Sequence, residues 1–312
     1  MTEKTRVVFF DILRIVFICA IVFFHYELSI IKDFVSPLYQ EGYIFFVYPE
    51  SFALLAVYGL ILVSGAVLEL NYTGKINTIK EYIKFIYRRC ARLYPTYWLS
   101  LILGFEMVLA ILPSFIEIYN ESFLGMAIEF TGFYPFFGLG LQWLNQMGWF
   151  IGTIVSLYFL YPFISSALKK NPYLYIILFA GLSWISRYYL QYYVDDWVLG
   201  YRIFPLCNLF EFALGILIVQ KIWYPSTTKQ YPTIYKISDL TFYIFITHML
   251  IIQHIRIDVL IQNIFPYSQT DILAVTFWYG LVIVEYFVIA YLFMRVDKGV
   301  FQPIIRGTKN VT

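Results

Sequence analysis

One apolar segment near the start of the chain contains an arginine and a histidine whose spacing suits catalysis on a long substrate. Between Phe9 and Phe24 the only charged residues are Asp11 and Arg14, and His25 follows directly. In a helix, Arg14 and His25 share one face, because eleven residues make three turns plus about 20°, and they lie roughly 16 Å apart along the axis. A guanidinium holds phosphates well, and an imidazole acts as a general base. Coenzyme A, with phosphates at one end and a thioester at the other, fits this spacing.

A second interpretation involves no chemistry. Ionisable groups inside a membrane segment are costly and are functional candidates by default. Arginine side chains near the end of a span also extend toward the interface, however, and a histidine can bind a backbone carbonyl. Asp11 lies three residues before Arg14 and can pair with it on the same helix face. The spacing is compatible with both interpretations.

Three further arginines, Arg88, Arg89 and Arg92, end a basic segment directly before Leu93-Tyr94-Pro95. They are candidates for binding phosphates at the mouth of a span. Taken alone, they are more typical of the positive charges that anchor a cytoplasmic loop.

Four other polar residues, Glu106, Glu211, His248 and Glu285, lie in apolar segments. Each is more typical of helix packing or of a cavity wall than of catalysis.

These residues must be positioned by helices that cross a membrane. Only 13% of the residues are charged and 61% are hydrophobic, against roughly 25% charged residues in soluble domains. A span needs about 20 mostly apolar residues, and in lipid only helices and closed barrels pair all backbone groups. The apolar runs are too long and continuous for barrel strands. We therefore predict an all-α, polytopic transmembrane helical bundle that forms a single domain over residues 1–312.

The apolar segments predict about eight spans. Lysine and arginine gather in alternate loops, which marks those loops as cytoplasmic, so both termini of this multi-pass cell-membrane protein are expected in the cytoplasm. A basic surface helix is expected at 75–92 and a buried or re-entrant segment at 122–142. The spans are expected at 9–31, 50–70, 93–113, 147–168, 172–191, 203–223, 237–257 and 272–296.

Other site classes are not expected. The three cysteines, Cys19, Cys90 and Cys207, are scattered in or beside spans. They predict neither a disulfide nor a metal site. No tract of lysine and arginine indicates binding to nucleic acid, and membrane lipids are the expected surroundings.

Several motifs together resemble the membrane acyltransferase-3 family of O-acetyltransferase-like integral membrane proteins. Asp11, Arg14 and His25 in the first span resemble the start of that family, and the other landmarks follow in the family's order. They are Val63-Ser64-Gly65, Arg88-Arg89-x-x-Arg92-Leu93-Tyr94-Pro95, Trp149-Phe150, Leu157 to Pro162, Phe212-x-x-Gly215 and the segment that ends in His248. Each motif is loose, but their ordered sum is specific and covers nearly the whole chain.

The resemblance implies transfer of an acyl group, often acetyl, from acyl-CoA to a hydroxyl of a cell-surface or lipid-linked carbohydrate. It implies that His25 is the essential base or a transient acyl carrier, with Arg14 as its companion. Arg14, Arg88, Arg89 and Arg92 are expected to bind the donor, which is a substrate and not a permanently bound cofactor. Asp11, Trp149, Glu211 and His248 are further candidates for the site.

The chain departs from the family in two ways. Many members carry a glutamate five residues after the tryptophan of the fourth span, where this chain has Ile154. Many members also have ten spans. The alternative function is a transporter or flippase of a lipid-linked sugar or acyl donor, but such proteins commonly contain inverted repeats or broken spans in matching halves, which this sequence lacks.

Overall fold

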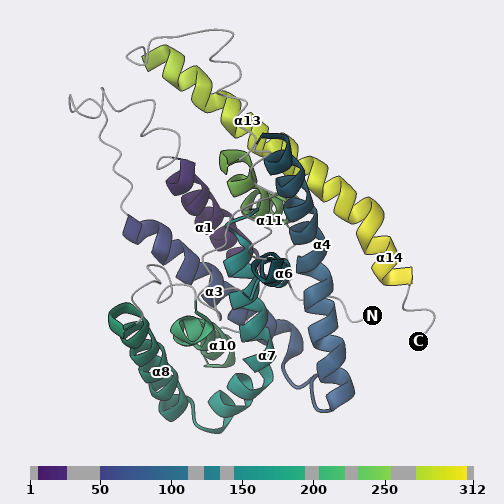
Figure 1. The fold of residues 1–312 in the computed structure, drawn as a ribbon. Coiled ribbons are helices and arrows are strands. Elements are labelled where there is room, and N and C mark those ends of the chain that lie inside the picture. The colour runs from purple at the N-terminus through teal and green to yellow at the C-terminus, as the bar shows by residue number, and fades with distance from the viewer. Residues whose placement is uncertain are drawn as a thin grey trace.

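The computed structural model describes residues 6–26, 50–111, 123–133, 144–193, 204–221, 231–253 and 272–307. All regular structure in these ranges is helical (Figure 1), which confirms the all-α helical bundle. The elements are α1 (Val8–Tyr26), α3 (Glu50–Tyr72), α4 (Ile79–Ile111), α6 (Phe123–Thr131), α7 (Gly148–Lys170), α8 (Pro172–Tyr193), η3 (Pro205–Asn208), α10 (Leu209–Lys221), α11 (Pro232–Gln253), α13 (Ile272–Val296), η4 (Asp297–Phe301) and α14 (Gln302–Gly307).

Each expected span overlaps one of these helices, although α10 covers only 209–221 of the span expected at 203–223 and α4 begins 14 residues before the span expected at 93–113. Four of the helices are long and apolar enough to cross a membrane, over Val8–His25, Ala53–Tyr72, Gly148–Lys170 and Pro232–Ile251. Parts of the expected segments lie outside the described residues, among them 27–31 of the first span and 134–142 of the re-entrant segment. Within the latter, α6 is a short helix next to α7.

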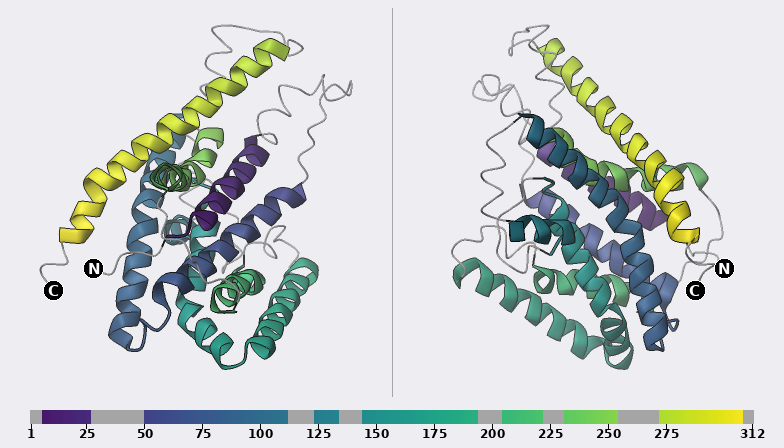
Figure 2. Two further views of the ribbon diagram at one scale, coloured as in Figure 1. Left: turned by 180° about the vertical axis from the view of Figure 1, so that it is seen from behind. Right: turned by 45° about the vertical axis from the view of Figure 1, so that its right-hand side comes forward.

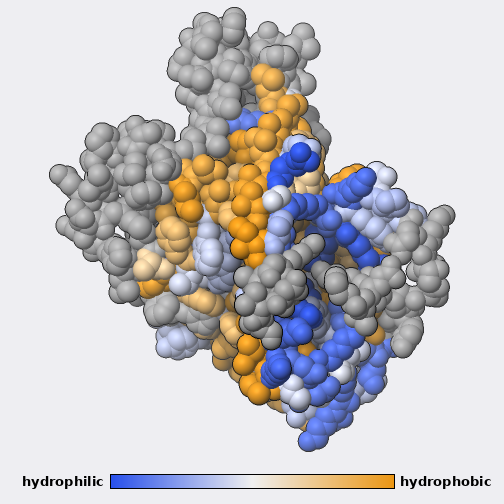
Figure 3. Space-filling view, turned by 90° about the vertical axis from the view of Figure 1, so that its right-hand side faces the viewer, coloured by the Kyte–Doolittle hydropathy of each residue, from blue (hydrophilic) through white to orange (hydrophobic). Residues whose placement is uncertain are grey.

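The surface agrees with a membrane location. In Figure 3, hydrophobic residues cover a broad region of one face, whereas hydrophilic residues gather at the lower end. On α8, large apolar side chains such as Tyr173 and Trp184 are about four-fifths exposed, at 81% and 77%. In water such a surface would be unfavourable, but in lipid it needs no cover.

Helix α4 differs from its sequence-based prediction, because the basic segment and the third span form one continuous helix with Pro95 inside it. Proline removes the hydrogen bond to the carbonyl four residues earlier, which here belongs to Ala91. The side-chain amide of Gln302 donates to that carbonyl at 3.5 Å. A polar group from the C-terminal segment thus partly replaces the bond that Pro95 cannot make.

The start of α4 is set by a capping box at Thr78 and Glu81. The hydroxyl of Thr78 accepts from the amide of Glu81 at 3.2 Å, and the Glu81 carboxylate accepts from the amide of Thr78 at 3.0 Å and of Asn77 at 2.9 Å. Bonds from the Asn77 amide and from Thr78 hold the pKa of Glu81 below its usual value.

Helices α1 and α11 run side by side in the same direction. Near their starts, the guanidinium of Arg14 donates to the hydroxyl of Ser238 at 3.1 Å. Near their ends, the rings of His25 and His248 lie 5.4 Å apart between centroids. The two contacts are eleven residues apart on α1 and ten residues apart on α11, so the two helices stay side by side at matching positions over about three turns.

Helix α3 runs opposite to α1. The ring of Phe17 fills the space beside Gly59 on α3. Seven residues earlier on α1, Phe10 packs against Val63, which lies four residues after Gly59 on α3. Helix α7 in turn follows the direction of α3, because Tyr158 is bonded to Ser64 and Ser165 to Glu69.

Helices α3 and α10 approach each other closely. A methyl group at Gly65 would overlap the carbonyl oxygen of Phe212, and one at Gly215 would overlap the carbonyl oxygen of Leu62. Small residues at such crossings let backbones come together in a membrane, where packing contributes much of the association energy.

A buried polar network joins the same helices at their far end. The carboxylate of Glu69 accepts hydrogen bonds from Tyr161 at 2.9 Å, from Ser165 at 2.7 Å and from Gln220 at 3.0 Å. Glu69 is 1% exposed, and these donors from α7 and α10 satisfy a group that would otherwise be costly to bury.

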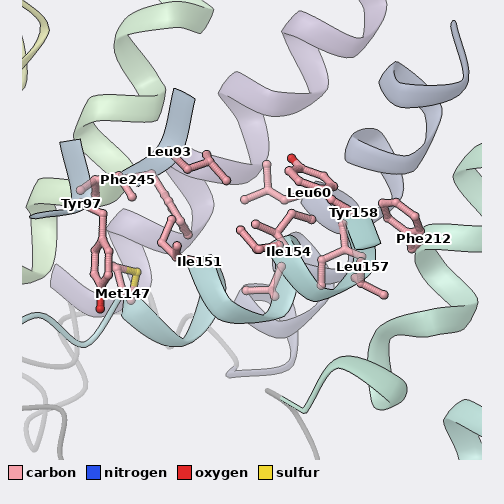
Figure 4. Close-up of a cluster of buried hydrophobic side chains, with 14 of the residues drawn as sticks. Leu60, Leu93, Tyr97, Met147, Ile151, Ile154, Leu157, Tyr158, Phe212 and Phe245 are labelled. Atoms are coloured by element: carbon pink, nitrogen blue, oxygen red, sulfur yellow. The ribbon is translucent and has the colours of Figure 1, made fainter. Parts of the chain in front are cut away.

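Helix α7 runs through the centre of the core. On this helix Ile151, Ile154 and Leu157 are among the buried side chains. They pack in one cluster with Leu60 of α3 and Phe212 of α10 (Figure 4). Ile154 is therefore a packing residue. Helix α13 lies along the outside of this bundle against α11 (Figure 2).

Candidate functional site

The site begins as a cavity of about 460 Å³ at the starts of α1 and α11. Its walls come from α1, α3, α4, α11 and the C-terminal segment of η4 and α14. Four basic and three acidic side chains line it, which gives a positive balance. They are Arg6, Arg14, Arg92, Lys298, Asp11, Asp239 and Asp297.

The acidic residue Asp11 organises one side of this cavity. It is 3% exposed and accepts from Arg6 at 2.9 Å and from Arg14 at 3.2 Å. Arg6 also pairs with Asp239 at 3.0 Å. Arg14 uses a single guanidinium nitrogen, Nη1, for both Asp11 and Ser238, so its remaining N–H groups have no partner among the described residues and are open to a ligand.

The other two cations, Arg92 and Lys298, have no carboxylate partner among the described residues. The third carboxylate, Asp297, is 3% exposed and instead accepts from Tyr243 at 2.7 Å and from Gln302 at 3.2 Å. Since every acidic group in the cavity has its own donors, the unpaired positive charge favours an anionic ligand.

The second part of the site is the pair of histidines at the other end of α1 and α11. His248 is fully buried, and its Nδ1 lies 2.7 Å from the carbonyl oxygen of Phe245. Its Nε2 has no partner among the described residues. His25 is half-buried and contacts the rings of Phe24 and His248.

One pair of helices therefore connects the two parts. Arg14 and Ser238 lie at the cavity, and His25 and His248 lie about three turns further along the same two helices, roughly 16 Å away. An elongated ligand with an anionic end could bind in the cavity and present its other end to the histidines.

The three arginines of α4 separate in the structure. Arg92 lines the cavity together with Arg14, whereas Arg88 is exposed and is not part of the cavity wall. Arg89 is buried with its guanidinium 4.6 Å above the ring of Tyr72 and 5.7 Å from that of Tyr158. Such stacking is a favourable use of a desolvated cation, and it gives Arg89 a packing role.

Two other candidates lie apart from the cavity. Glu211 pairs with Arg187 of α8 at 2.7 Å, which connects two helices of the bundle. Trp149 packs its ring edge-on against Phe150 at 5.7 Å. The side chain of Glu106 is outside the described residues.

Sequence reasoning missed Arg6, Ser238, Asp239 and Lys298 as site residues. The two basic residues looked like topological charges outside spans. Ser238 and Asp239 precede His248 by ten and nine residues, much as Arg14 precedes His25 by eleven. That similarity becomes informative only when the two helices are known to be parallel neighbours.

The structure thus combines a helical membrane bundle, a positively charged cavity and a pair of histidines. Residues 7–238 match the acyltransferase-3 family model, described as an acyltransferase domain, and the chain belongs to this family. His248 and the C-terminal wall of the cavity lie beyond the matched residues. Comparison with curated proteins and with solved structures gave no match.

The different positions of the three arginines predict different effects on replacement by glutamine. With acyl-CoA, the donor that the family resemblance implies, Arg92→Gln is expected to raise the Michaelis constant by about tenfold or more, because a hydrogen bond to a charged group contributes about 1.5–3 kcal/mol. Arg88→Gln is the matched control and should leave that constant unchanged. Arg89→Gln should lower the thermal unfolding temperature in detergent. Donor-titration kinetics measure the Michaelis constants, and thermal unfolding curves measure the stability of Arg89→Gln. An unchanged Michaelis constant in Arg92→Gln would contradict the donor role.

Proposed function

We propose that this membrane acyltransferase-family protein transfers an acyl group, commonly acetyl, from acyl-CoA to a hydroxyl of a cell-surface or lipid-linked carbohydrate. The observation that carries the proposal is the joint placement of a positive cavity and a histidine pair on α1 and α11. The family match supports the reaction class. The carbohydrate acceptor is what the family resemblance implies.

At the donor end, the phosphates of coenzyme A would bind to Arg14, Arg92 and Lys298. Arg14 is held by Asp11 and Ser238, so its guanidinium plane is fixed before the ligand arrives. A preorganised fork of this kind loses less freedom on binding than a flexible side chain. The donor's arm then follows α1 and α11 toward the histidines.

At the reacting end, His25 would act as the general base. Its ring nitrogen takes the proton of the acceptor hydroxyl while the oxygen attacks the thioester carbonyl carbon. The carbon–sulfur bond breaks, and the leaving thiolate receives the proton from the His25 imidazolium. The products are an ester and free coenzyme A, and His25 returns to its neutral form.

The direct test is incubation of the purified protein in detergent or nanodiscs with acyl-labelled coenzyme A and candidate glycans. Label is expected to move to the glycan in proportion to the free thiol released. A protein that binds labelled acyl-CoA or moves it across a proteoliposome membrane, but never forms labelled ester, would instead be a transporter.

We further propose that both termini and the donor cavity face the cytoplasm. The distribution of lysine and arginine supports this orientation. The helix directions agree with spans that alternate in direction: α1 and α11 are parallel, as the first and seventh spans must be, and α3 runs opposite to α1. Cytoplasmic acyl-CoA would then enter the cavity directly.

Two single cysteines test the orientation in a background from which Cys19, Cys90 and Cys207 have been removed. Tyr193→Cys lies at the far end of α8, about 33 Å along the helix from its start, and should react with an impermeant thiol reagent added to intact cells. Lys170→Cys should react only after permeabilisation. The opposite labelling pattern would reverse the proposed orientation.

A further inference from the structure

We propose that His248 is a positioning residue that binds the ring of His25 and fixes its tautomer, in the role that a carboxylate commonly has beside a catalytic histidine. The inference rests on the proposed function, because it assigns a partner to the general base of that reaction.

The hydrogen bond at Nδ1 sets the tautomer of His248. A carbonyl oxygen has no proton to donate, so at 2.7 Å from the oxygen of Phe245 the Nδ1 atom must be the donor. In a neutral imidazole the other nitrogen is then an acceptor. Nε2 of His248 is therefore a lone-pair acceptor, and it has no partner among the described residues.

His25 lies close enough to this acceptor to be its partner. His248 is fully buried, where an unsatisfied polar atom is costly, and the His25 ring is 5.4 Å away between centroids. An N–H of His25 donating to Nε2 would satisfy the buried atom. In the part of the chain that the structure describes, no carboxylate forms an ion pair with His25.

The surrounding helix turn holds His248 in place. The side-chain amide of Asn145 donates to the carbonyl oxygen of Ile246 at 2.9 Å and to Ser100 at 2.7 Å. The two bonds of Asn145, which precedes α7, thus connect Ser100 of α4 with the backbone of α11 two residues before His248. The acceptor nitrogen is thus fixed before substrate binds.

The consequence for the reaction is specific. When one nitrogen of His25 donates to His248, the other carries the lone pair and is free to accept the proton of the hydroxyl. After that transfer the His25 imidazolium keeps its bond to His248 Nε2, which stabilises the charge until the proton passes to the leaving thiolate. Orientation and charge stabilisation are what the third member of a catalytic triad provides.

The first test is His248→Ala with small-molecule rescue. The turnover number is expected to fall by about tenfold or more, short of the loss expected for His25 itself, with little change in the donor Michaelis constant, because the cavity lies three turns away. Added imidazole should restore activity. Pyrrole, which has the same shape but no acceptor nitrogen, should not. Equal rescue by both compounds, or no loss of activity, would overturn the proposal.

A second pair of variants covers the case in which His248→Ala does not fold. His248→Gln retains an acceptor and His248→Leu does not, and both fill the site. Glutamine should retain more activity than leucine at similar unfolding temperatures, and equal activities would count against the proposal. An active wild type with an inactive His25→Ala but a fully active His248→Leu rejects only this inference, whereas a wild type without transfer rejects the proposed function itself.

Discussion

Replacement of His25 by alanine is expected to lower the turnover number by about 10²–10⁴-fold, the usual contribution of a positioned general base. The loss follows from the proposed role, because His25 is the histidine on the same helix face as Arg14, about three turns further along α1. Acyl-CoA binding should persist, since the cavity at Arg14 and Arg92 is unaltered.

The measurement combines initial rates of ester formation with a separate binding assay for the donor. The matched control is Cys19→Ala, an exposed position on the same helix, which should leave both quantities unchanged. If His25→Ala keeps more than a few per cent of wild-type turnover, the histidine has a packing role and the base must be sought elsewhere.

The second large effect is expected at the α3–α10 crossing. Gly215→Ala places a methyl group on the carbonyl oxygen of Leu62, a backbone atom that cannot move aside without separating the helices. Overpacking of this kind costs about 1–3 kcal/mol and sometimes more. We expect a markedly lower unfolding temperature in detergent and a reduced yield of folded protein.

The control is the same substitution at Gly181 on α8, where an added methyl group meets nothing within 4 Å. Because alanine is favoured over glycine in helices by up to about 1 kcal/mol, Gly181→Ala should be neutral or slightly stabilising. The crossing would not be the critical contact if both substitutions gave the same unfolding temperature.

The sequence predicts the helical class well, because the cost of placing charge in lipid leaves long uncharged runs that mark helices directly. It does not predict that α4 is continuous through Pro95. In the structure the carbonyl that Pro95 leaves without its backbone partner accepts from Gln302, more than 200 residues away, and a local sequence pattern does not show such a contact.

The site is predicted in part for a similar reason. Arg14 and His25 can be identified within one helix, since their spacing alone places them on a common face. The sequence alone does not show that Arg89 and Arg92 have different surroundings, because two residues three apart can share one helix face. The direction of Arg89 is decided by the rings of Tyr72 and Tyr158 on other helices.

The pairing of α1 with α11 also has a consequence for biosynthesis. Arg14 and Ser238 are 224 residues apart in the chain, and at about 5–20 residues per second roughly 10–45 seconds of synthesis separate them. During that time the first helix lies in the bilayer without its later partner. Asp11, three residues from Arg14 and bonded to it at 3.2 Å, is a partner that the nascent helix carries with it. In the folded protein this carboxylate orients the Arg14 guanidinium. During synthesis it also lowers the free-energy cost of holding Arg14 in lipid until α11, in the last third of the polypeptide, has been made.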